Sequence, residues 1–258
     1  MTTYHRPTTL EEALEYLSQS DAVPLGGGTT LAQRTHRLPR IVDLQNAGLD
    51  DITVKGSRME AGATGRLQAL LEHASTPPVL RQVLHLEAPP NLRNMRTLAG
   101  ALLTADGRSP FAAVMMALDA SVRRITFADD GTPQAEETVS VGHLLLERVT
   151  APARRQLLLG FNLPLNVRLG FAHVARTPSD RPILDAALVQ WPSGRTRLVM
   201  GGWGTAPTLA MDGSGAEGLP AAARNACYEA ADAFASAEYR REVGPTLAQR
   251  ALRQVMDD

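Results

Sequence analysis

The chain has 258 residues, with 27 acidic and 26 basic side chains and a formal net charge of −1 at pH 7. Hydrophobic residues make up 44% of it and charged residues 21%, which is typical of a globular protein. The balanced charge argues against a nucleic-acid binder that works through bulk electrostatics. The single cysteine, Cys227, excludes an internal disulfide, and it excludes an iron–sulfur cluster or zinc site built from cysteines of this chain.

The amino-terminal segment carries no basic stretch followed by a long apolar run, so we expect no signal peptide. No apolar segment approaches the roughly 20 residues that a membrane-spanning helix requires. We therefore expect a cytoplasmic protein without a membrane span.

Residues 1–50 predict a small α/β unit. Thr9 and Glu12 form the pattern of a capping box, and apolar residues then recur at helical spacing until about residue 18. Apolar runs at 22–25 and 40–44 are typical of short buried strands. Three glycines, Gly26 to Gly28, follow the first of these strands directly, which predicts a glycine loop at its end.

Residues 51–164 predict a larger α+β unit. Alternation on both sides of residues 55–57 indicates a hairpin over 51–63. We interpret residues 91–102 as a loop that enters a short strand. Helices are expected over 65–72, 79–86 and 111–118, and strands over 122–127 and 157–161, the last ending at Pro164.

Residues 165–258 predict a third unit, which begins at a break near residue 165. Segments 170–176, 183–191 and 196–201 predict a three-stranded antiparallel sheet, with a turn at 192–194 between the last two strands. Helices are expected over 220–237 and 245–256. Each of these begins with a proline, which is well tolerated at the first helical position.

The glycine run with Thr29 and Thr30 is the first candidate for chemistry. Backbone N–H groups without side chains can approach a phosphate closely, and a turn after a strand can direct several of them at one anion. The alternative is a tight turn that needs a positive φ angle. The run matches neither a P-loop nor the G-x-G-x-x-G pattern, so spacing alone leaves both interpretations open.

A second candidate is the run of small residues at 99–101, which would allow a flat or bulky group to lie against the backbone. Close packing between strands is the alternative interpretation. Arg93, Arg96 and Arg108 bracket this run. They could neutralise a pyrophosphate, or they could be solvated surface charges.

No other group of residues forms a catalytic or metal-binding pattern. The six histidines show no close pairing at metal-ligand spacing, and no serine lies in a Gly-x-Ser-x-Gly turn. Asp43, Asp106 and Asp185 are isolated carboxylates that suggest no acid–base pair. We therefore predict no catalytic residues and no metal site in this chain, so any chemistry would come from a cofactor.

The order of several short motifs resembles the FAD-binding medium subunit of the molybdenum hydroxylases, which include the xanthine dehydrogenase and aerobic carbon monoxide dehydrogenase types. The resemblance covers essentially the whole chain. It rests on 25–31 (LGGGTTL), 41–44 (IVDL), 62–64 (GAT), 92–94 (LRN), 97–100 (TLAG), 118–120 (LDA), 163–164 (LP) and the carboxy-terminal unit that follows.

The resemblance implies an α+β fold of the vanillyl-alcohol oxidase type, in which two units hold FAD, followed by a unit with a three-stranded sheet and helices. The loop 25–31 would hold the FAD pyrophosphate through backbone amides, so a side chain at Gly27 would take the phosphate's place. Residues 97–101 would form a second wall. The residues assigned to the cofactor are Leu25, Gly26, Gly27, Gly28, Thr29, Thr30, Leu31, Asn94, Thr97, Ala99, Gly100, Ala101, Asp106, Leu158 and His173.

Two positions depart from the family pattern. Ala99 stands where the family usually has glycine, and its methyl group could press on the cofactor. Ser109-Pro110 stands where the family tends to place an aspartate for the ribose hydroxyls, and Asp106 is a nearby substitute.

The resemblance implies an electron-transfer subunit. Electrons would pass from a molybdopterin-binding large subunit through a [2Fe-2S] small subunit to this chain. The chain would then pass them to an acceptor such as NAD, oxygen or a quinone. The departures at Ala99 and Pro110 leave a flavin-poor or flavin-free scaffold subunit as an alternative. A stand-alone flavin oxidoreductase is a third possibility.

Overall fold

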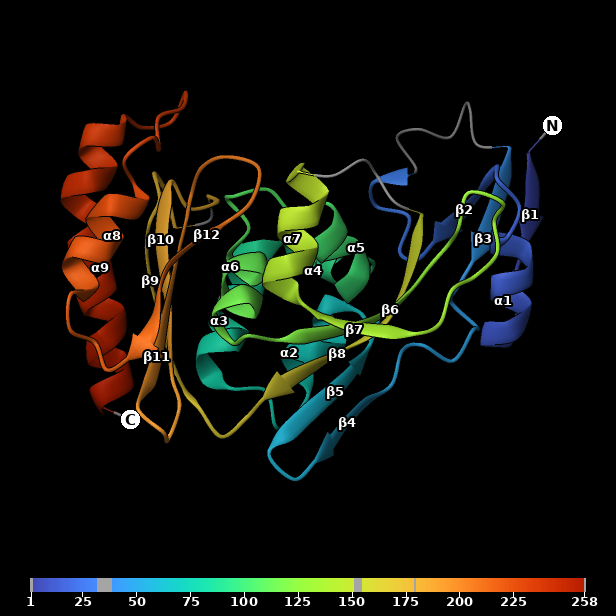
Figure 1. The fold of residues 1–258 in the computed structure, drawn as a ribbon, viewed down its shortest axis with the longest axis horizontal. Helices are drawn as coiled ribbons and strands as arrows, with labels where there is room; N and C mark the ends of the chain where they lie inside the picture. Colours follow the sequence, from blue (N-terminus) through green and yellow to red (C-terminus); the bar gives the residue numbers. More distant parts are fainter. Residues whose placement is uncertain (1, 32–38, 151–154, 179, 258) are drawn as a thin grey trace.

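The computed structural model describes residues 2–31, 39–150, 155–178 and 180–257. Three sheets follow one another along the long axis of the molecule (Figure 1). The amino-terminal sheet and helix α1 lie at one end, and helices α8 and α9 lie at the other. The middle sheet is covered by the helices of the central part of the chain.

The first sheet is parallel, with strand order β1-β3-β2, and it carries the loop that later forms the candidate site. Helix α1 begins where Thr9 Oγ1 accepts a hydrogen bond from Glu12 N–H at 3.2 Å, as the capping pattern predicted. The Glu12 carboxylate returns to the N–H of Thr8 rather than to Thr9. The elements are β1 (Thr3–His5), α1 (Leu10–Leu17), β2 (Ala22–Leu25) and β3 (Arg40–Asp43).

The second sheet is antiparallel, with strand order β4-β5-β8-β6-β7. The expected hairpin is confirmed as β4 and β5, and the expected strand ending at Pro164 is β8. The elements of this part are β4 (Ile52–Lys55), β5 (Arg58–Gly62), α2 (Leu67–Glu72), α3 (Pro78–Glu87), α6 (Pro110–Ala117), β6 (Ser121–Thr126), β7 (Glu137–Ser140), α7 (Val141–Thr150) and β8 (Gln156–Pro164).

The prediction of a strand within residues 91–102 is wrong, because this segment forms two short helices. They are α4 (Pro90–Arg93) and α5 (Leu98–Leu103). Thr97 caps α5 by accepting a hydrogen bond from Gly100 N–H at 3.1 Å. The small residues that suggested close strand packing are equally compatible with a capped helical turn.

The third sheet has four antiparallel strands rather than the predicted three, in the order β12-β11-β10-β9. The additional strand β12 lies at the edge and is largely exposed, so its sequence lacks the apolar alternation of a buried strand. The strands are β9 (Arg168–Val174), β10 (Leu184–Gln190), β11 (Arg195–Gly201) and β12 (Thr208–Ser214).

Of the two carboxy-terminal helices, the first ends earlier than predicted and the second begins earlier, while the start of the first and the end of the second lie within one residue of the prediction. They are α8 (Leu219–Ala226) and α9 (Ala237–Asp257). Ser236 Oγ accepts a hydrogen bond from Tyr239 N–H and starts α9 well before Pro245, which lies inside the helix. The proline was therefore a misleading start signal, because the serine cap precedes it.

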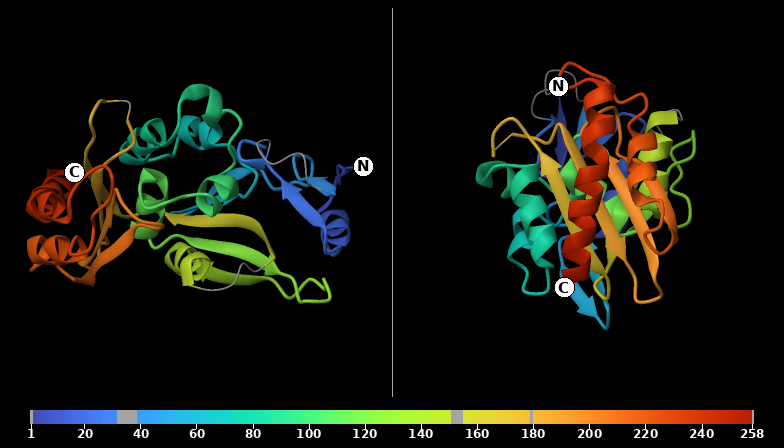
Figure 2. Two further views of the ribbon diagram at one scale, coloured as in Figure 1. Left: turned by 90° about the horizontal axis from the view of Figure 1, so that it is seen from above. Right: turned by 90° about the vertical axis from the view of Figure 1, so that its left-hand side faces the viewer.

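The third sheet contributes to two hydrophobic cores. Ala187 and Val189 face the main core, which the second sheet and helices α3 and α6 also form. Leu184, Ala186 and Leu188 face the opposite way and pack in a second core with residues of α8 and α9. These two helices cover that side of the third sheet (Figure 2). No helix in the described part of the chain is both long enough and apolar enough to cross a membrane.

Arg240 on α9 is the most deeply buried cation of the second of these cores, with its side chain 0% exposed. Its guanidinium donates hydrogen bonds to the carbonyls of Ile183 and Gly202 and to the Asp232 carboxylate. We expect Arg240→Leu to lower the free energy of unfolding by about 3–5 kcal/mol, because it leaves the carbonyl acceptors of this core without a donor and removes the partner of Asp232.

Urea denaturation of the purified chain measures this effect. The matched control is Arg250→Leu, a change of an exposed arginine on the same helix, which should shift stability by less than about 0.5 kcal/mol. Equal losses for the two variants would show that the buried network is dispensable.

Candidate functional site

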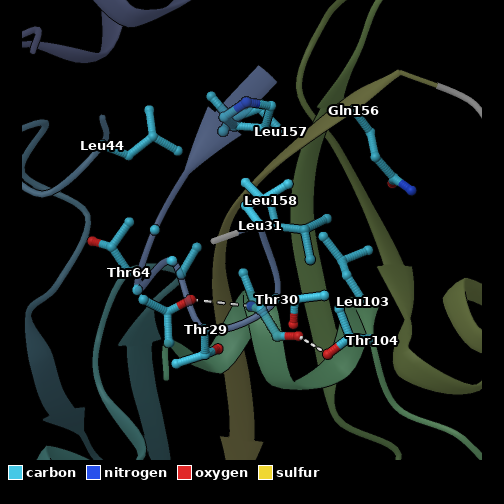
Figure 3. Close-up of a pocket in the computed structure, with 18 residues that line it drawn as sticks. Thr29, Thr30, Leu31, Leu44, Thr64, Leu103, Thr104, Gln156, Leu157 and Leu158 are labelled. Carbon is cyan, nitrogen blue, oxygen red and sulfur yellow. Dashed lines mark hydrogen bonds between the residues drawn. The ribbon is translucent and has the colours of Figure 1, made fainter. Parts of the chain in front are cut away.

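A cavity of about 180 Å³ lies between the loop after β2, the first turns of α5 and the start of β8 (Figure 3). It joins elements from the first sheet, the second sheet and the helical layer. Its wall is largely apolar on the side of β3 and β8 and polar at the loop. The lining residues are Pro24, Gly26, Gly27, Gly28, Thr29, Thr30, Leu31, Leu44, Ala63, Thr64, Thr97, Ala99, Gly100, Leu103, Thr104, Gln156, Leu157 and Leu158.

The glycine loop begins where β2 ends, at the carboxyl edge of the parallel sheet. Leu25 C=O accepts a hydrogen bond from Leu44 N–H at 2.9 Å, and the chain then leaves the sheet. Gly28 has a φ of +69°, which favours glycine. Within the described residues, the backbone N–H groups of 27–30 have no hydrogen-bond acceptor. The loop therefore offers free donors at the wall of the cavity.

Gly27 serves a different purpose from the one expected from the sequence. A Cβ atom at this position would lie 1.7 Å from the carbonyl oxygen of Met95 and 3.2 Å from the Cα of Arg96. The hydrogen of Gly27 thus faces the segment before α5, and a side chain there would strike protein backbone. Glycine is required here so that the two segments can pack directly together.

The opposite wall is the first part of α5, which the preceding turn holds in place. Ala99 N–H donates to Ala63 C=O at 3.0 Å, which ties the helix to the end of β5. Thr104 Oγ1 donates to Gly100 C=O at 2.7 Å, and this bond and the one from Gly100 N–H to Thr97 Oγ1 are drawn in Figure 3. These bonds present the Gly100 backbone to the cavity.

Thr64 is the buried polar side chain of this wall that lacks a partner. The residue is 8% exposed, and its Oγ1 makes no hydrogen bond with any described residue. Thr64 also lines an adjacent cavity of about 340 Å³ behind Gly26 and Gly27. Free hydroxyl and N–H donors beside an apolar wall suit a ligand that combines an anionic group with a flat apolar ring.

Most of the predicted cofactor residues come together at this cavity. Gly26 to Leu31, Thr97, Ala99, Gly100 and Leu158 all line it. Leu25 lies on β2 just before the loop, and Asn94 lines the adjacent cavity. Ala101 is fully buried and packs in the main core instead.

Asp106 and His173 do not line the cavity. Burial would raise the pKa of Asp106, but its ion pair with Arg181 and the N–H of Arg108 lower it overall. His173 lies on β9 and stacks on Phe171 with ring centroids 5.6 Å apart, and burial lowers its pKa. A flavin contact by His173 stays a prediction.

Side chains of the protein accept hydrogen bonds from the N–H groups at the amino-terminal end of α6. Pro110 is buried there, and Ser109 caps the helix by accepting from Ala112 N–H. The Glu87 carboxylate accepts hydrogen bonds from Ser109 Oγ at 2.8 Å and from Phe111 N–H at 3.2 Å. Burial raises the pKa of Glu87.

Sequence reasoning missed several lining residues because they come from distant parts of the chain. Leu44, Ala63 and Thr64 carried a signal, since they lie in the motifs 41–44 and 62–64, but no role was assigned to them. The other missed residues are Pro24, Leu103, Thr104, Gln156 and Leu157.

The close approach at Gly27 makes a prediction about the ligand-free protein. We expect Gly27→Ala to lower the free energy of unfolding by about 1–3 kcal/mol, because the methyl group forces the loop away from Met95. Thermal or urea unfolding without any ligand measures this loss. The control is Gly213→Ala on β12, where a Cβ would meet nothing within 4 Å. A stable Gly27→Ala variant that loses only ligand binding would restore the sequence-based interpretation.

Comparison with known proteins supports one family. Residues 1–166 match the family described as the FAD binding domain in molybdopterin dehydrogenase. The 6-hydroxypseudooxynicotine dehydrogenase complex subunit alpha of Paenarthrobacter nicotinovorans is 27% identical over 96% of this chain and 92% of its own. The carbon monoxide dehydrogenase medium chain of Afipia carboxidovorans is 31% identical over 46% of this chain and 44% of its own.

Solved structures share the fold over the whole chain. Quinoline 2-oxidoreductase from Pseudomonas putida 86 superposes with a TM-score of 0.80 at 21% identity, over 100% of this chain and 97% of that one. Reconstituted CO dehydrogenase from Oligotropha carboxidovorans gives 0.79 at 22% identity, over 100% and 98%. These matches confirm the predicted fold class. The chain belongs to the family of the FAD binding domain in molybdopterin dehydrogenase, as the order of its sequence motifs predicted.

Proposed function

We propose that this chain is the FAD-carrying electron-transfer subunit of a molybdenum-containing hydroxylase or dehydrogenase complex. The observation that carries the proposal is the cavity where the glycine loop meets α5. FAD bound there would supply the redox chemistry that links partner iron–sulfur clusters to an acceptor such as NAD, oxygen or a quinone.

The residues present fit this cofactor. In our proposal the free N–H groups of 27–30 hold the pyrophosphate, and the Thr64 hydroxyl donates to an oxygen of the same ligand. Leu44, Leu157 and Leu158 exclude water from one of its rings. The loop and the α5 turn set the position of the cofactor, because their direct backbone packing leaves little freedom to move.

The proposal assigns the metal centres to partner subunits. Cys227 is the only cysteine, and burial raises the pKa of its thiol to about 11, so it stays protonated at neutral pH. The relative from Paenarthrobacter is named as one subunit of a dehydrogenase complex, which supports the presence of partner subunits. We propose a molybdopterin-binding subunit and a [2Fe-2S] subunit as these partners. A cytoplasmic location and units bounded at residues 50 and 164 are parts of the same proposal.

Purification of the tagged chain from its own source, followed by analysis of bound flavin, molybdenum and iron, tests the proposal. FAD together with molybdenum and iron is the expected result. Molybdenum and iron without flavin would favour the scaffold alternative, which the methyl group of Ala99 at the cavity wall motivates. FAD without either metal, with substrate turnover by the isolated chain, would favour a stand-alone oxidoreductase.

Thr64 provides a prediction within the site. We expect Thr64→Val to raise the Kd for FAD about three- to tenfold, because the variant loses one neutral hydrogen bond to the ligand. The stability of the ligand-free protein should not fall, because the change removes a buried hydroxyl that has no partner. Titration followed by flavin fluorescence measures the Kd. Thr138→Val, at an exposed position on β7, is the control, and an equal Kd for both variants would remove Thr64 from the proposed contacts.

A further inference from the structure

Three arginines bracket the α5 wall in the sequence, and the structure separates them by how fully their donors are used. Arg93 donates from Nε to Gln68 Oε1 at 2.9 Å and from Nη1 to Ala88 C=O at 2.6 Å, so it ties helices together. Arg93 is also 5% exposed. It has no freedom to meet a ligand.

Arg108 is also committed to the protein. Its Nε donates to Pro182 C=O at 3.0 Å and its Nη2 to Arg181 C=O at 2.9 Å, while its guanidinium lies 3.8 Å from the ring centroid of Phe234. Arg148 beneath α5 is held in the same way, by the carbonyls of Leu102, Leu103 and Thr205. Both side chains are therefore fixed by backbone acceptors.

Arg96 is held far more loosely. Its Nη2 donates to Thr104 Oγ1 at 2.8 Å, and Thr104 itself lines the cavity and donates to Gly100 C=O. The guanidinium thus lies one hydroxyl group away from the cavity wall. Its Nε is buried and has no acceptor among the described residues.

Arg96 makes one long contact with a buried carboxylate, that of Glu87. Glu87 Oε1 lies 3.4 Å from Arg96 Nη1, which is long for a charge-assisted hydrogen bond. The other oxygen of Glu87 already accepts from Ser109 Oγ and Phe111 N–H. The side chain of Arg96 is only 19% exposed, and this long contact compensates its charge only weakly.

We propose that Arg96 is the cation that neutralises the phosphate groups of the dinucleotide, and that Glu87 is its weakly bound partner before a phosphate binds. The inference rests on the proposed FAD site, since it names a further binding residue of that site. A guanidinium binds phosphate through parallel charge-assisted N–H bonds, and Arg96 retains unused donors for them. Neutral backbone donors of the glycine loop would then share the phosphate with one full positive charge.

The test measures the Kd for FAD on the full chain at several salt concentrations. We expect Arg96→Met to raise the Kd about ten- to one-hundredfold and to weaken its dependence on salt, because a charged contact is lost. Arg96→Lys should recover part of the affinity. Glu87→Gln should lower the Kd, because it removes the carboxylate that competes with the phosphate for Arg96.

Matched controls separate binding from folding and from failure of the proposed function. Arg58→Met removes an exposed arginine from the β4–β5 hairpin and should leave the Kd unchanged. If Arg96→Met binds FAD as tightly as Arg58→Met, or with the salt dependence of the wild type, the inference is overturned. The inference is also overturned if Glu87→Gln does not bind FAD more tightly than the wild type and Arg96→Lys does not bind it more tightly than Arg96→Met. Absence of FAD binding by the wild-type chain would instead refute the proposed function.

Discussion

The contact between two backbones, at Gly27 and Met95, is the constraint on which the candidate site depends. A Cβ at Gly27 would lie 1.7 Å from the Met95 carbonyl oxygen, so only glycine allows the loop after β2 to rest on the segment before α5. This packing sets the N–H groups of the loop opposite Gly100, and none of them has an acceptor among the described residues. The cavity is thus a product of close packing, and the described part of the chain leaves its N–H donors unused.

The carboxy-terminal sheet is integral to the structure that supports this site. One of its faces completes the main core against α3 and α6, and the other forms a second core with α8 and α9. The buried Arg240 joins the loop before β10 to the turn after β11 and to Asp232. Removing this unit would expose apolar faces of the central helices, so the site and the sheet are expected to be stable only together.

The structure shows which side chain binds at the position where Ser109 and Pro110 depart from the family pattern. At Ser109 and Pro110, the helix end is satisfied by Glu87, a carboxylate that comes from α3 rather than from the loop. The same Glu87 lies beside Arg96, whose Nε has no acceptor among the described residues. In our interpretation this chain has no aspartate for the ribose at this position, and the loosely held Arg96 binds the phosphate groups.

The glycine loop after a buried strand, the hairpin, the central helices and, through the order of short motifs, the family could be predicted from the amino-acid sequence. The structural features among these are local, because caps, turns and periodicity depend on residues close together in the chain. The folded structure was needed to show that residues 91–102 contain two short helices, that β12 completes the third sheet, and that Gly27 packs on Met95. It alone distinguished Arg96 from Arg93, because the acceptors that bind a guanidinium are supplied by segments that meet only when the chain has folded.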